Sequence, residues 1–349
     1  MSLTFYITKF LIISGLAFIL SFIWVPFLDK FLHQHKLVKQ IRSSSSAPIF
    51  YNLHKNKKET PTSAGLLIWL TVAILTLLFY FLSRFTDIDF FKSFNFLSRG
   101  ETFLPLGALV ASALVGLVDD LLNIKGIGPN GGGLKVRHRL ILYTLIALFG
   151  AWWFYFKLDW DIIRIPFIGT FNLGLWYVLL FVFIIVATSF SVNETDGLDG
   201  LAGGVLLICF GAYAIISFFQ GRYDLVCFCG AIIGSLTAFL WFNIYPARFF
   251  MGDTGAMSLG VVLGIIAMLT NEFLLLPFIG FILAFESLSV VIQVLSKKIR
   301  KKKIFLSTPI HHHFEAIGWP EPKVVMRFWL ISVVGAGAGL IIFLLEQLL

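Results

Sequence analysis

Residues 179–219 read LLFVFIIVATSFSVNETDGLDGLAGGVLLICFGAYAIISFF, and this stretch decides the fold because one polar block separates two almost wholly apolar runs. A transmembrane helix needs roughly 20 apolar residues, and the chain on each side of the block supplies a run of that kind. The block itself carries Glu194, Asp196 and Asp199. Ionisable residues beside hydrocarbon are costly, so they usually mark a site or a water-filled cavity.

The composition of the whole chain extends this interpretation. The sequence has 349 residues, 58% hydrophobic and 13% charged, with a mean hydropathy of +0.90. A soluble domain carries about 25% charged residues, so a soluble globular protein is excluded. We predict an all-α, polytopic membrane protein with a single domain over residues 1–349 and about ten transmembrane helices. The expected spans are 3–28, 64–83, 103–118, 139–156, 173–191, 200–219, 224–243, 254–271, 273–295 and 325–347.

Two features of the apolar runs have simple interpretations. The first run is too long for a signal-peptide core and has no small-residue cleavage site, so we expect it to be retained. Cys209, Cys227 and Cys229 all fall in apolar runs and lack the second pair that a zinc site needs, so we expect plain helix residues.

The distribution of Lys and Arg predicts the orientation in the membrane. Loops 29–63, 119–139, 244–253 and 296–324, with Arg327 just beyond, carry 20 of the 27 Lys and Arg residues. Because cytoplasmic loops are enriched in these residues, we expect this face to be cytoplasmic and both termini to be extracytoplasmic. The tract KKIRKKKIF at 297–305 is then a topology signal near anionic lipid headgroups, rather than a nucleic-acid site.

Six carboxylates gather at the predicted cytoplasmic edge. Without Cys or paired His ligands, such a cluster suits Mg²⁺, which takes one or two carboxylates with waters and substrate phosphates. Asn193, Asp196 and Asp199 recur every three residues, which predicts one face of a helical turn with Glu194 turned away. Any single acid could instead cap a helix. The six are Asp119, Asp120, Glu194, Asp196, Asp199 and Asp253.

Two further motifs belong to the same face. In GDTG, Asp253 and Thr254 are expected at a helix start, where free N–H groups and the helix dipole favour phosphate. In STPIHHHFEAIGW (307–319), three consecutive histidines point about 100° apart on a helix and cannot share one metal. We interpret this segment as a loop over the cytoplasmic cavity that presents one or two imidazoles to a phosphate or sugar. A solvated interfacial loop is the alternative.

Together these motifs resemble those of the phospho-N-acetylmuramoyl-pentapeptide transferases, in the polyprenyl-phosphate N-acetylhexosamine-1-phosphate transferase superfamily. The resemblance covers most of the chain in order, and HHHFE with GW is its most specific mark. The matching segments are TPT (60–62), VDD (118–120), NETDGLDGLAGG (193–204), NIYPARFFMGDTGAMSLG (243–260) and residues 286–332.

The resemblance implies a reaction in peptidoglycan biosynthesis, at the plasma (inner) membrane of a bacterium. Undecaprenyl phosphate attacks the sugar-linked phosphorus of UDP-N-acetylmuramoyl-pentapeptide, lipid I forms and UMP leaves, with Mg²⁺ required. Direct attack is preferred over an aspartyl-phosphate intermediate, because a phosphate nucleophile needs no relay. The expected partners are these two substrates and membrane lipids, with no nucleic acid, and a homodimer is possible.

The resemblance also implies roles for individual residues. Asp119 is the expected base for the lipid phosphate, with Asp120 beside it, and Asp253 with Asn193 is expected to hold Mg²⁺. Phe250 is expected to stack on uracil. The remaining expected substrate contacts are Lys57, Thr62, Asn193, Asp196, Asp199, Asn243, Gln293, His311, His312 and His313.

The chain departs from the family pattern at several positions. The usual TPTMGG is TPTSAG here, Asn123 stands where a Lys is usual, and Glu194 replaces an apolar residue. The first cytoplasmic loop, around 42–56, is longer than usual and the Gly-rich loop 126–133 is unusual. These departures affect the expected lipid-phosphate contacts and loop geometry more than the reaction.

Two rival functions remain at this level. A sister transferase would move GlcNAc-1-phosphate to the same lipid, and the HHHFE segment argues against it. A non-catalytic cation or lipid transporter would place acids at mid-membrane, where Glu286 is the only candidate, and Glu286 could instead mark a helix break.

Overall fold

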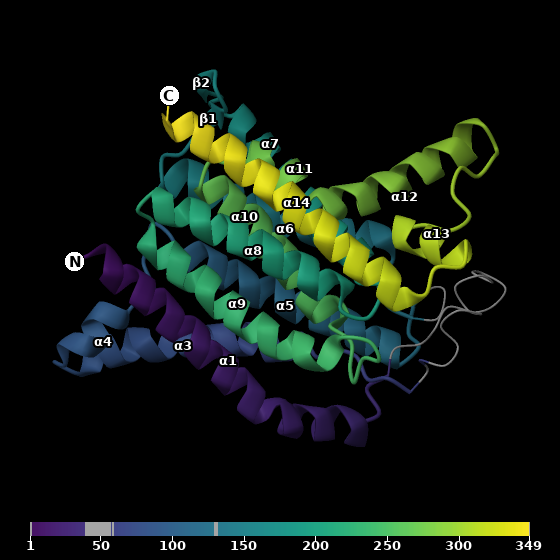
Figure 1. The fold of residues 1–349 in the computed structure, drawn as a ribbon, viewed down its shortest axis with the longest axis horizontal. Coiled ribbons are helices and arrows are strands. Elements are labelled where there is room, and N and C mark those ends of the chain that lie inside the picture. Colours follow the sequence, from purple (N-terminus) through teal and green to yellow (C-terminus); the bar gives the residue numbers. More distant parts are fainter. Residues whose placement is uncertain (1, 39–56, 58, 129–131, 349) are drawn as a thin grey trace.

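The computed structural model describes residues 2–38, 57, 59–128 and 132–348. They form a bundle of long helices with one small hairpin (Figure 1). The helices are α1 Leu3–Gln34, α3 Leu66–Phe85, α4 Asp89–Phe94, α5 Phe103–Ile124, α6 Val136–Lys157, α7 Trp176–Thr195, α8 Leu201–Phe219, α9 Tyr223–Asn243, α10 Gly252–Leu269, the 3₁₀ turn η3 Phe273–Leu275, α11 Leu276–Ile279, α12 Phe281–Ile299, α13 Ile310–Ala316 and α14 Glu321–Leu348.

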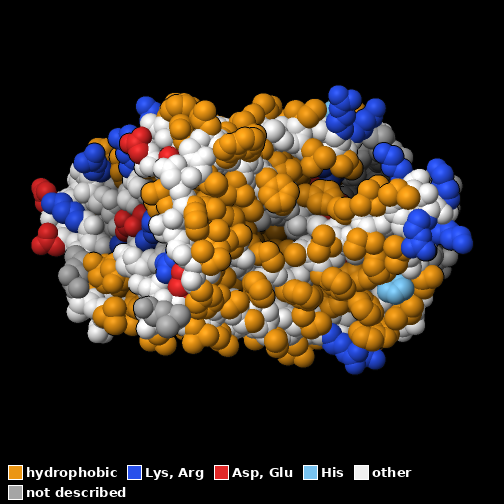
Figure 2. All heavy atoms as spheres, turned by 90° about the horizontal axis from the view of Figure 1, so that it is seen from above, with side chains coloured by type: hydrophobic (Ala, Val, Ile, Leu, Met, Phe, Trp, Pro, Cys, Tyr) orange, Lys and Arg blue, Asp and Glu red, His pale blue; other side chains and the backbone are white. Residues whose placement is uncertain are grey.

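The predicted class and number of spans are confirmed. Within the described ranges, nine helices are long and apolar enough to cross a membrane, and Phe273–Ile279 with Phe281–Ile299 makes a tenth if that pair is one broken span. Hydrophobic side chains cover the middle of the face shown in Figure 2, with Lys and Arg gathered toward its ends. Both termini lie at one end of the bundle, as an even number of passes requires (Figure 1). Which side of the membrane that end faces stays a prediction.

Three predicted spans differ clearly from the observed helices. The first continues to Gln34 and the third to Ile124, each about six residues beyond the expected ends at residues 28 and 118. The ninth is broken at Gly280, where the chain bends by 86° and α12 leaves the bundle as an arm (Figure 1). The residues around this break are uniformly apolar, so hydropathy alone could not reveal it. Helix α13 lies between α12 and α14 and closes the arm back onto the bundle.

Helix α10 forms the centre of the bundle and positions the site. Every residue of α10 is buried, and its largest contacts are with α5 and α7. Gly116 of α5 permits the closest approach, because a Cβ there would lie 2.3 Å from the carbonyl oxygen of Asp253. The start of α10 is thereby held against the acidic end of α5.

The opposite end of the bundle carries an antiparallel hairpin of β1 Ile162–Ile165 and β2 Gly169–Asn172. Arg164 of β1 ties this hairpin to the bundle, since its Nε lies 2.8 Å from Glu346 and its Nη1 lies 3.5 Å from Glu272. Glu272 is only 1% exposed. Burial raises the pKa of its carboxyl to about 7, against the lowering effect of Arg164.

Candidate active site

The segment Asn193–Gly200 connects α7 to α8 and organises the site. Helix α7 ends at Thr195. Of the three polar residues predicted to share one helical face, Asn193 lies in the helix, while Asp196 and Asp199 lie in the turn that follows. The predicted single helical face is therefore wrong. Gly200 adopts a positive φ of 79°, and its N–H donates to Asn243 Oδ1 at 3.1 Å. Because of this turn, Asn193 and Asp199 contact different neighbours, Arg139 and Lys57.

The first contact of this segment is between Asn193 and Arg139. Arg139 lies on α6 and contacts side chains of α5, α7 and α10. Its Nε lies 2.5 Å from Asp119 of α5, and its Nη1 donates to Asn193 Oδ1 at 3.0 Å. Its Nη2 lies 3.2 Å from Asp253 of α10. Asn193 Nδ2 also donates to Asp253 Oδ1 at 2.6 Å. We call Asp119, Arg139, Asn193 and Asp253 the Arg139 cluster.

The two adjacent aspartates of α5 do different work. Both lie inside the helix, which continues to Ile124 rather than ending at the pair. Asp120 accepts the backbone N–H of Asp253 at 2.9 Å and that of Thr254 at 3.2 Å, so it satisfies the first amides of α10. Asp119 instead accepts the N–H of Leu134 at 2.6 Å and pairs with Arg139. The expected catalytic pair thus divides into one residue at the cluster and one that anchors a helix start.

The described part of the Gly-rich loop packs onto α5. Asn123 Nδ2 donates to the carbonyl of Gly132 at 3.3 Å, so the residue found in place of the usual Lys holds the loop. Leu134, which follows the loop, reaches Asp119 as described above. Residues 129–131 lie outside the described part of the chain, and so do 42–56 of the long first loop.

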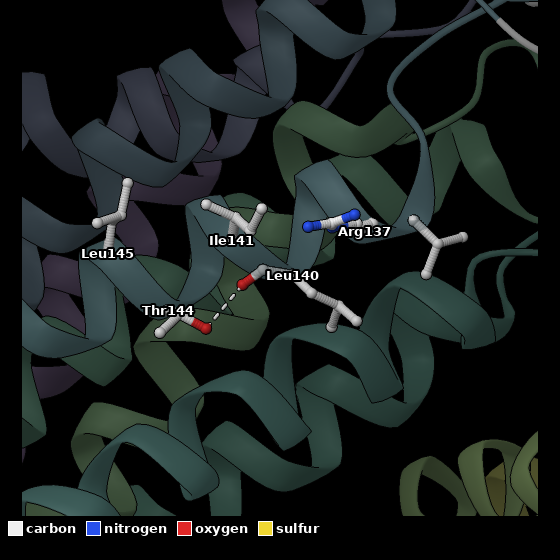
Figure 3. Close-up of a pocket in the computed structure, with 6 residues that line it drawn as sticks. Arg137, Leu140, Ile141, Thr144 and Leu145 are labelled. Atoms are coloured by element: carbon white, nitrogen blue, oxygen red, sulfur yellow. Dashed lines mark hydrogen bonds between the residues drawn. The ribbon is translucent and has the colours of Figure 1, made fainter.

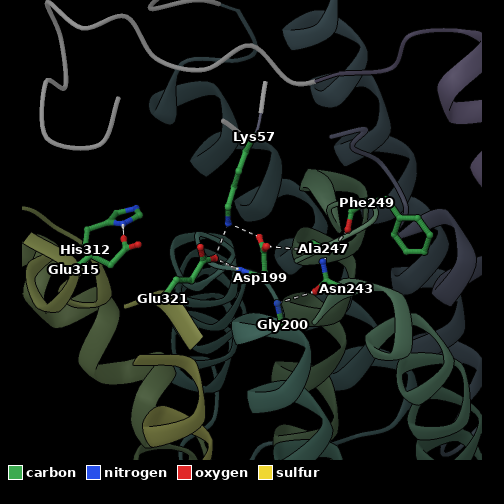
Figure 4. Close-up of polar contacts among 9 residues, drawn as sticks. All are labelled: Lys57, Asp199, Gly200, Asn243, Ala247, Phe249, His312, Glu315 and Glu321. Atoms are coloured by element: carbon green, nitrogen blue, oxygen red, sulfur yellow. Dashed lines mark hydrogen bonds and ion pairs between the residues drawn. The ribbon is translucent and has the colours of Figure 1, made fainter. Parts of the chain in front are cut away.

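Lys57 forms the second contact of the segment. Its Nζ lies 2.5 Å from Asp199 Oδ1 and 2.6 Å from Glu321 Oε1 (Figure 4). The N–H of Asp199 donates to the same Glu321 oxygen at 2.7 Å, and Asp199 Oδ2 accepts the N–H of Ala247 at 3.0 Å. We call Lys57, Asp199 and Glu321 the Lys57 cluster.

Phe250, Asn243 and Thr62 are the other expected substrate contacts near this end of the site. Lys57 Nζ lies 5.8 Å from the centre of the Phe250 ring. Phe250 is the residue expected to stack on uracil, and that role stays a prediction. Asn243 is close by, as expected, and its Nδ2 donates to the carbonyl of Phe249 at 2.8 Å (Figure 4). Thr62, another expected substrate contact, is fully buried. It lies beside the start of α10, since a Cβ built on Gly252 would be 2.9 Å from Thr62 Oγ1.

The three histidines lie in helix α13 rather than in the predicted loop, and His311 makes the third contact of the segment, at Gly197. His311 Nδ1 lies 3.0 Å from Glu286 of α12, and His312 Nδ1 lies 2.7 Å from Glu315 (Figure 4 shows the second pair). As predicted, they do not point to one place. His313 is turned away, where its Nδ1 accepts the N–H of Leu306 at 3.3 Å.

Gln293 is placed apart from these three contacts. Its Oε1 accepts the N–H groups of Ile304 and Phe305, and its Nε2 donates to the carbonyl of Phe305. Within the described residues it therefore holds the loop after α12, and its assignment to substrate stays a prediction. Asp196 lies between Asn193 and Gly197 in the organising segment.

An apolar groove lies on the first turns of α6, the helix that carries Arg139. It has a volume of about 510 Å³, and Arg137 is the charged residue in its lining (Figure 3). Leu140 also lines a second hollow against α7, with Phe183 and Phe190. The lining of the first groove is Val136, Arg137, Leu140, Ile141, Thr144 and Leu145.

Four site residues escaped the sequence analysis, namely Arg139, Glu286, Glu315 and Glu321. In the sequence Arg139 is one of the loop charges, and Glu286 is either the mid-membrane acid of a transporter or the mark of a helix break. Arg139 reaches a residue 114 positions away, and Glu321 reaches one 264 positions away. The one available signal was local, since Glu315 stands three positions after His312, within reach on one helix face.

The donor set at Asp253 fits a magnesium ion. Among the residues described, no three His, Cys, Asp or Glu side chains lie close enough to hold a metal by themselves. Mg²⁺, however, usually takes one or two protein carboxylates and fills its other positions with water and substrate phosphates. Asp253 and the amide oxygen of Asn193 supply such a set. In this structure Arg139 pairs with Asp253 and donates to the same Asn193 oxygen, so it would have to release these oxygens before Mg²⁺ could bind.

One protein family and several known proteins match this sequence over long stretches. The family described as Glycosyl transferase family 4 matches residues 102–271. A protein of Chloroflexus aggregans (strain MD-66 / DSM 9485), named phospho-N-acetylmuramoyl-pentapeptide-transferase, is 37% identical over 343 residues, which cover 95% of this chain and 88% of that protein. Proteins of the same name from Anoxybacillus flavithermus (strain DSM 21510 / WK1) and Bacillus subtilis (strain 168) are 39% and 37% identical. They cover 94% of this chain each, and 96% and 95% of their own lengths.

Proposed function

The chain belongs to the phospho-N-acetylmuramoyl-pentapeptide transferase family, and from this premise we propose that it makes lipid I in peptidoglycan biosynthesis. Undecaprenyl phosphate attacks the sugar-linked phosphorus of UDP-N-acetylmuramoyl-pentapeptide. One P–O bond forms to the lipid phosphate, the P–O bond to the bridging oxygen breaks, and UMP leaves with that oxygen. The relatives of the same name, at 37–39% identity over nearly the whole chain, support a phospho-sugar transferase in a multi-pass membrane protein.

One observation carries the proposal. The eight residues Asn193–Gly200 touch the Arg139 cluster through Asn193 and the Lys57 cluster through Asp199. Between these two contacts, Gly197 lies against His311. Phosphoryl transfer depends chiefly on positioning and charge neutralisation, so a short rigid connection between two charged clusters supplies what this reaction requires.

The Arg139 cluster is the proposed phosphoryl-transfer end. Asp119 takes a proton or a hydrogen bond from the incoming lipid phosphate, and Arg139 neutralises charge on the phosphates. Asp253 and Asn193 would hold Mg²⁺, and the ion would supply polarisation of the diphosphate and stabilisation of the UMP leaving group. Asp120 fixes Asp253 by capping α10.

The Lys57 cluster is the proposed nucleotide end. Phe250 offers a ring face for uracil, and Lys57 and Asp199 supply a donor and an acceptor beside it. In the described structure, Lys57, Asp199 and Glu321 satisfy one another. Nucleotide binding therefore exchanges these contacts for contacts with substrate, and Asn243 keeps the surrounding backbone in place.

The membrane position follows from the acceptor. A prenyl chain must remain in hydrocarbon while its phosphate reaches the Arg139 cluster, and the groove on α6 offers an apolar surface on the same helix as Arg139. We place the site at the cytoplasmic edge of the bacterial inner membrane, in keeping with the excess of Lys and Arg on those loops.

The experiment that tests the function is UMP release by the purified protein. UDP-N-acetylmuramoyl-pentapeptide is supplied with and without undecaprenyl phosphate and with and without Mg²⁺. We expect release only when both are present. Release without any lipid, together with a phospho-sugar adduct on the enzyme, would replace direct attack by a covalent intermediate. Radiolabel transferred from UDP-GlcNAc instead would identify the sister transferase.

A further inference from the structure

Glu286 is the most deeply buried carboxylate in the described chain that the proposed mechanism leaves without a role. It lies in the first two turns of α12, just beyond the break at Gly280, and neither it nor His311 is exposed to solvent at all. Glu286 Oε2 lies 3.0 Å from His311 Nδ1 and 3.5 Å from the backbone nitrogen of the same residue. This contact joins the imidazole of α13 to the carboxyl of α12 inside the protein.

The far side of the His311 ring meets the organising segment. A Cβ built on Gly197 would lie 2.3 Å from His311 Nε2 and 2.8 Å from Cε1. No side chain fits in this space, so the ring packs directly on the backbone of Gly197. Gly197 stands between Asn193, which contacts Arg139, and Asp199, which contacts Lys57.

The neighbouring histidine repeats the arrangement without sharing this contact. His312 Nδ1 lies 2.7 Å from Glu315, and its ring centre is 4.0 Å from that of His311. His312 retains 6% of its exposure whereas His311 retains none. His312 is therefore the member of the pair that can meet a substrate, and His311 is built as an internal support.

We propose that Glu286 is a positioning residue that acts through His311 to hold the turn at Gly197. The chain of contacts Glu286–His311–Gly197 sets the separation between the phosphoryl-transfer end and the nucleotide end. This inference rests on the proposed function for its kinetic consequences, but the contact itself can be tested without turnover. It also gives Glu286 a role other than an ion pathway or a helix break.

The test compares Glu286→Leu and Glu286→Gln. Gln keeps a polar side chain that can hydrogen-bond to the His311 ring, whereas Leu keeps only the volume. We expect Gln to retain UMP release within about fivefold of wild type, and Leu to lose at least thirtyfold in kcat. Binding of UMP, measured by calorimetry, should change less than threefold in both, because the Lys57 cluster remains intact. Gly197→Ala, which pushes on the same ring from the other side, should repeat the kcat loss with UMP binding kept.

The matched control is Glu272→Leu. Glu272 is also buried, at 1% exposure, but lies at the other end of the bundle, and Arg164 keeps Glu346 as a partner when Glu272 is removed. We expect its kcat within twofold of wild type.

Turnover near wild type in Glu286→Leu would overturn the inference, and so would parallel losses of UMP binding and kcat in a folded protein. A wild type that releases no UMP would overturn the proposed function instead. In that case ¹⁵N NMR of the histidine side chains still decides. Glu286→Leu must shift the His311 Nδ1 signal, identified by its loss in His311→Gln, while Glu272→Leu must not.

Discussion

Asp120 on α5 accepts the backbone N–H of Asp253 on α10 at 2.9 Å, across 133 positions of sequence. A second bond, from Thr254 at 3.2 Å, makes Asp120 the anchor of the helix that carries the proposed metal ligand. The neighbouring Asp119 makes neither bond and faces Arg139 instead. Two adjacent acids thus have different partners, and we propose that one serves folding and the other chemistry.

The first prediction separates these two acids. Asp120→Ala leaves two buried amides of α10 without an acceptor, at a cost of about 1–3 kcal/mol each. We expect a clearly lower melting temperature in detergent, together with lost turnover. Asp119→Asn should melt near the wild-type temperature yet release UMP at least 100-fold more slowly. Equal melting temperatures for the two variants would refute the division of roles.

A second prediction concerns Arg139. Its guanidinium spans oxygens of Asp119, Asn193 and Asp253 at once, which the single ammonium of Lys cannot do. We expect Arg139→Lys to lower kcat on the order of 10-fold to 100-fold, and Arg139→Gln to lower it further. Steady-state UMP release gives both values. Arg84→Lys, in the last turn of α3 and outside both clusters and the groove, is the control and should retain kcat. A fully active Arg139→Gln would remove this residue from the site.

The nucleotide end gives a third prediction. Glu321 accepts from both Lys57 and the N–H of Asp199, so it sets the geometry of the pocket beside Phe250. Glu321→Ala should raise KM for the UDP-linked donor by about tenfold or more, with little change in KM for the lipid. Measuring the two KM values separately tests this. A larger effect on the lipid than on the nucleotide would mean that the two ends are assigned the wrong way round.

The fourth prediction concerns pH and the opposite end of the bundle. Burial raises the pKa of Glu272 to about 7 from 4.5, so the folded protein holds a proton that the unfolded chain releases. Stability is therefore greatest below about pH 4.5 as far as this group is concerned, and falls as pH rises toward 7. The charged groups that face it are Arg164 and Glu346. Glu272→Gln should flatten the melting temperature between pH 5 and pH 7.5. An unchanged slope would contradict the burial argument.

The sequence predicted the helical class and the number of spans because hydropathy is a property of local windows. The groupings of Asp253 with Asn193 and of Lys57 with Phe250 came from the family resemblance, since the residues are far apart in the chain. Hydropathy could not locate the break at Gly280, where apolar residues continue on both sides. The triple-histidine segment looked like a loop because a helix of seven residues is too short for a periodic pattern.

The polar block was misjudged for a related reason. A spacing of three suggested one helical face for Asn193, Asp196 and Asp199, but α7 ends within the block. The position where α7 ends is decisive, because Asn193 inside the helix contacts the Arg139 cluster and Asp199 beyond its end belongs to the Lys57 cluster. Partners such as Arg139 and Glu321 depend on tertiary packing, which a single sequence does not reveal.

The most direct test of the central claim is UMP release by Asp253→Ala. Asp253 joins the proposed Mg²⁺ site to Asn193 and Arg139 at the start of a wholly buried helix. The purified variant is compared with wild type at saturating UDP-N-acetylmuramoyl-pentapeptide, undecaprenyl phosphate and Mg²⁺. We predict no detectable release from a protein that melts at the wild-type temperature. Release near the wild-type rate would contradict the assignment of this cluster as the catalytic centre.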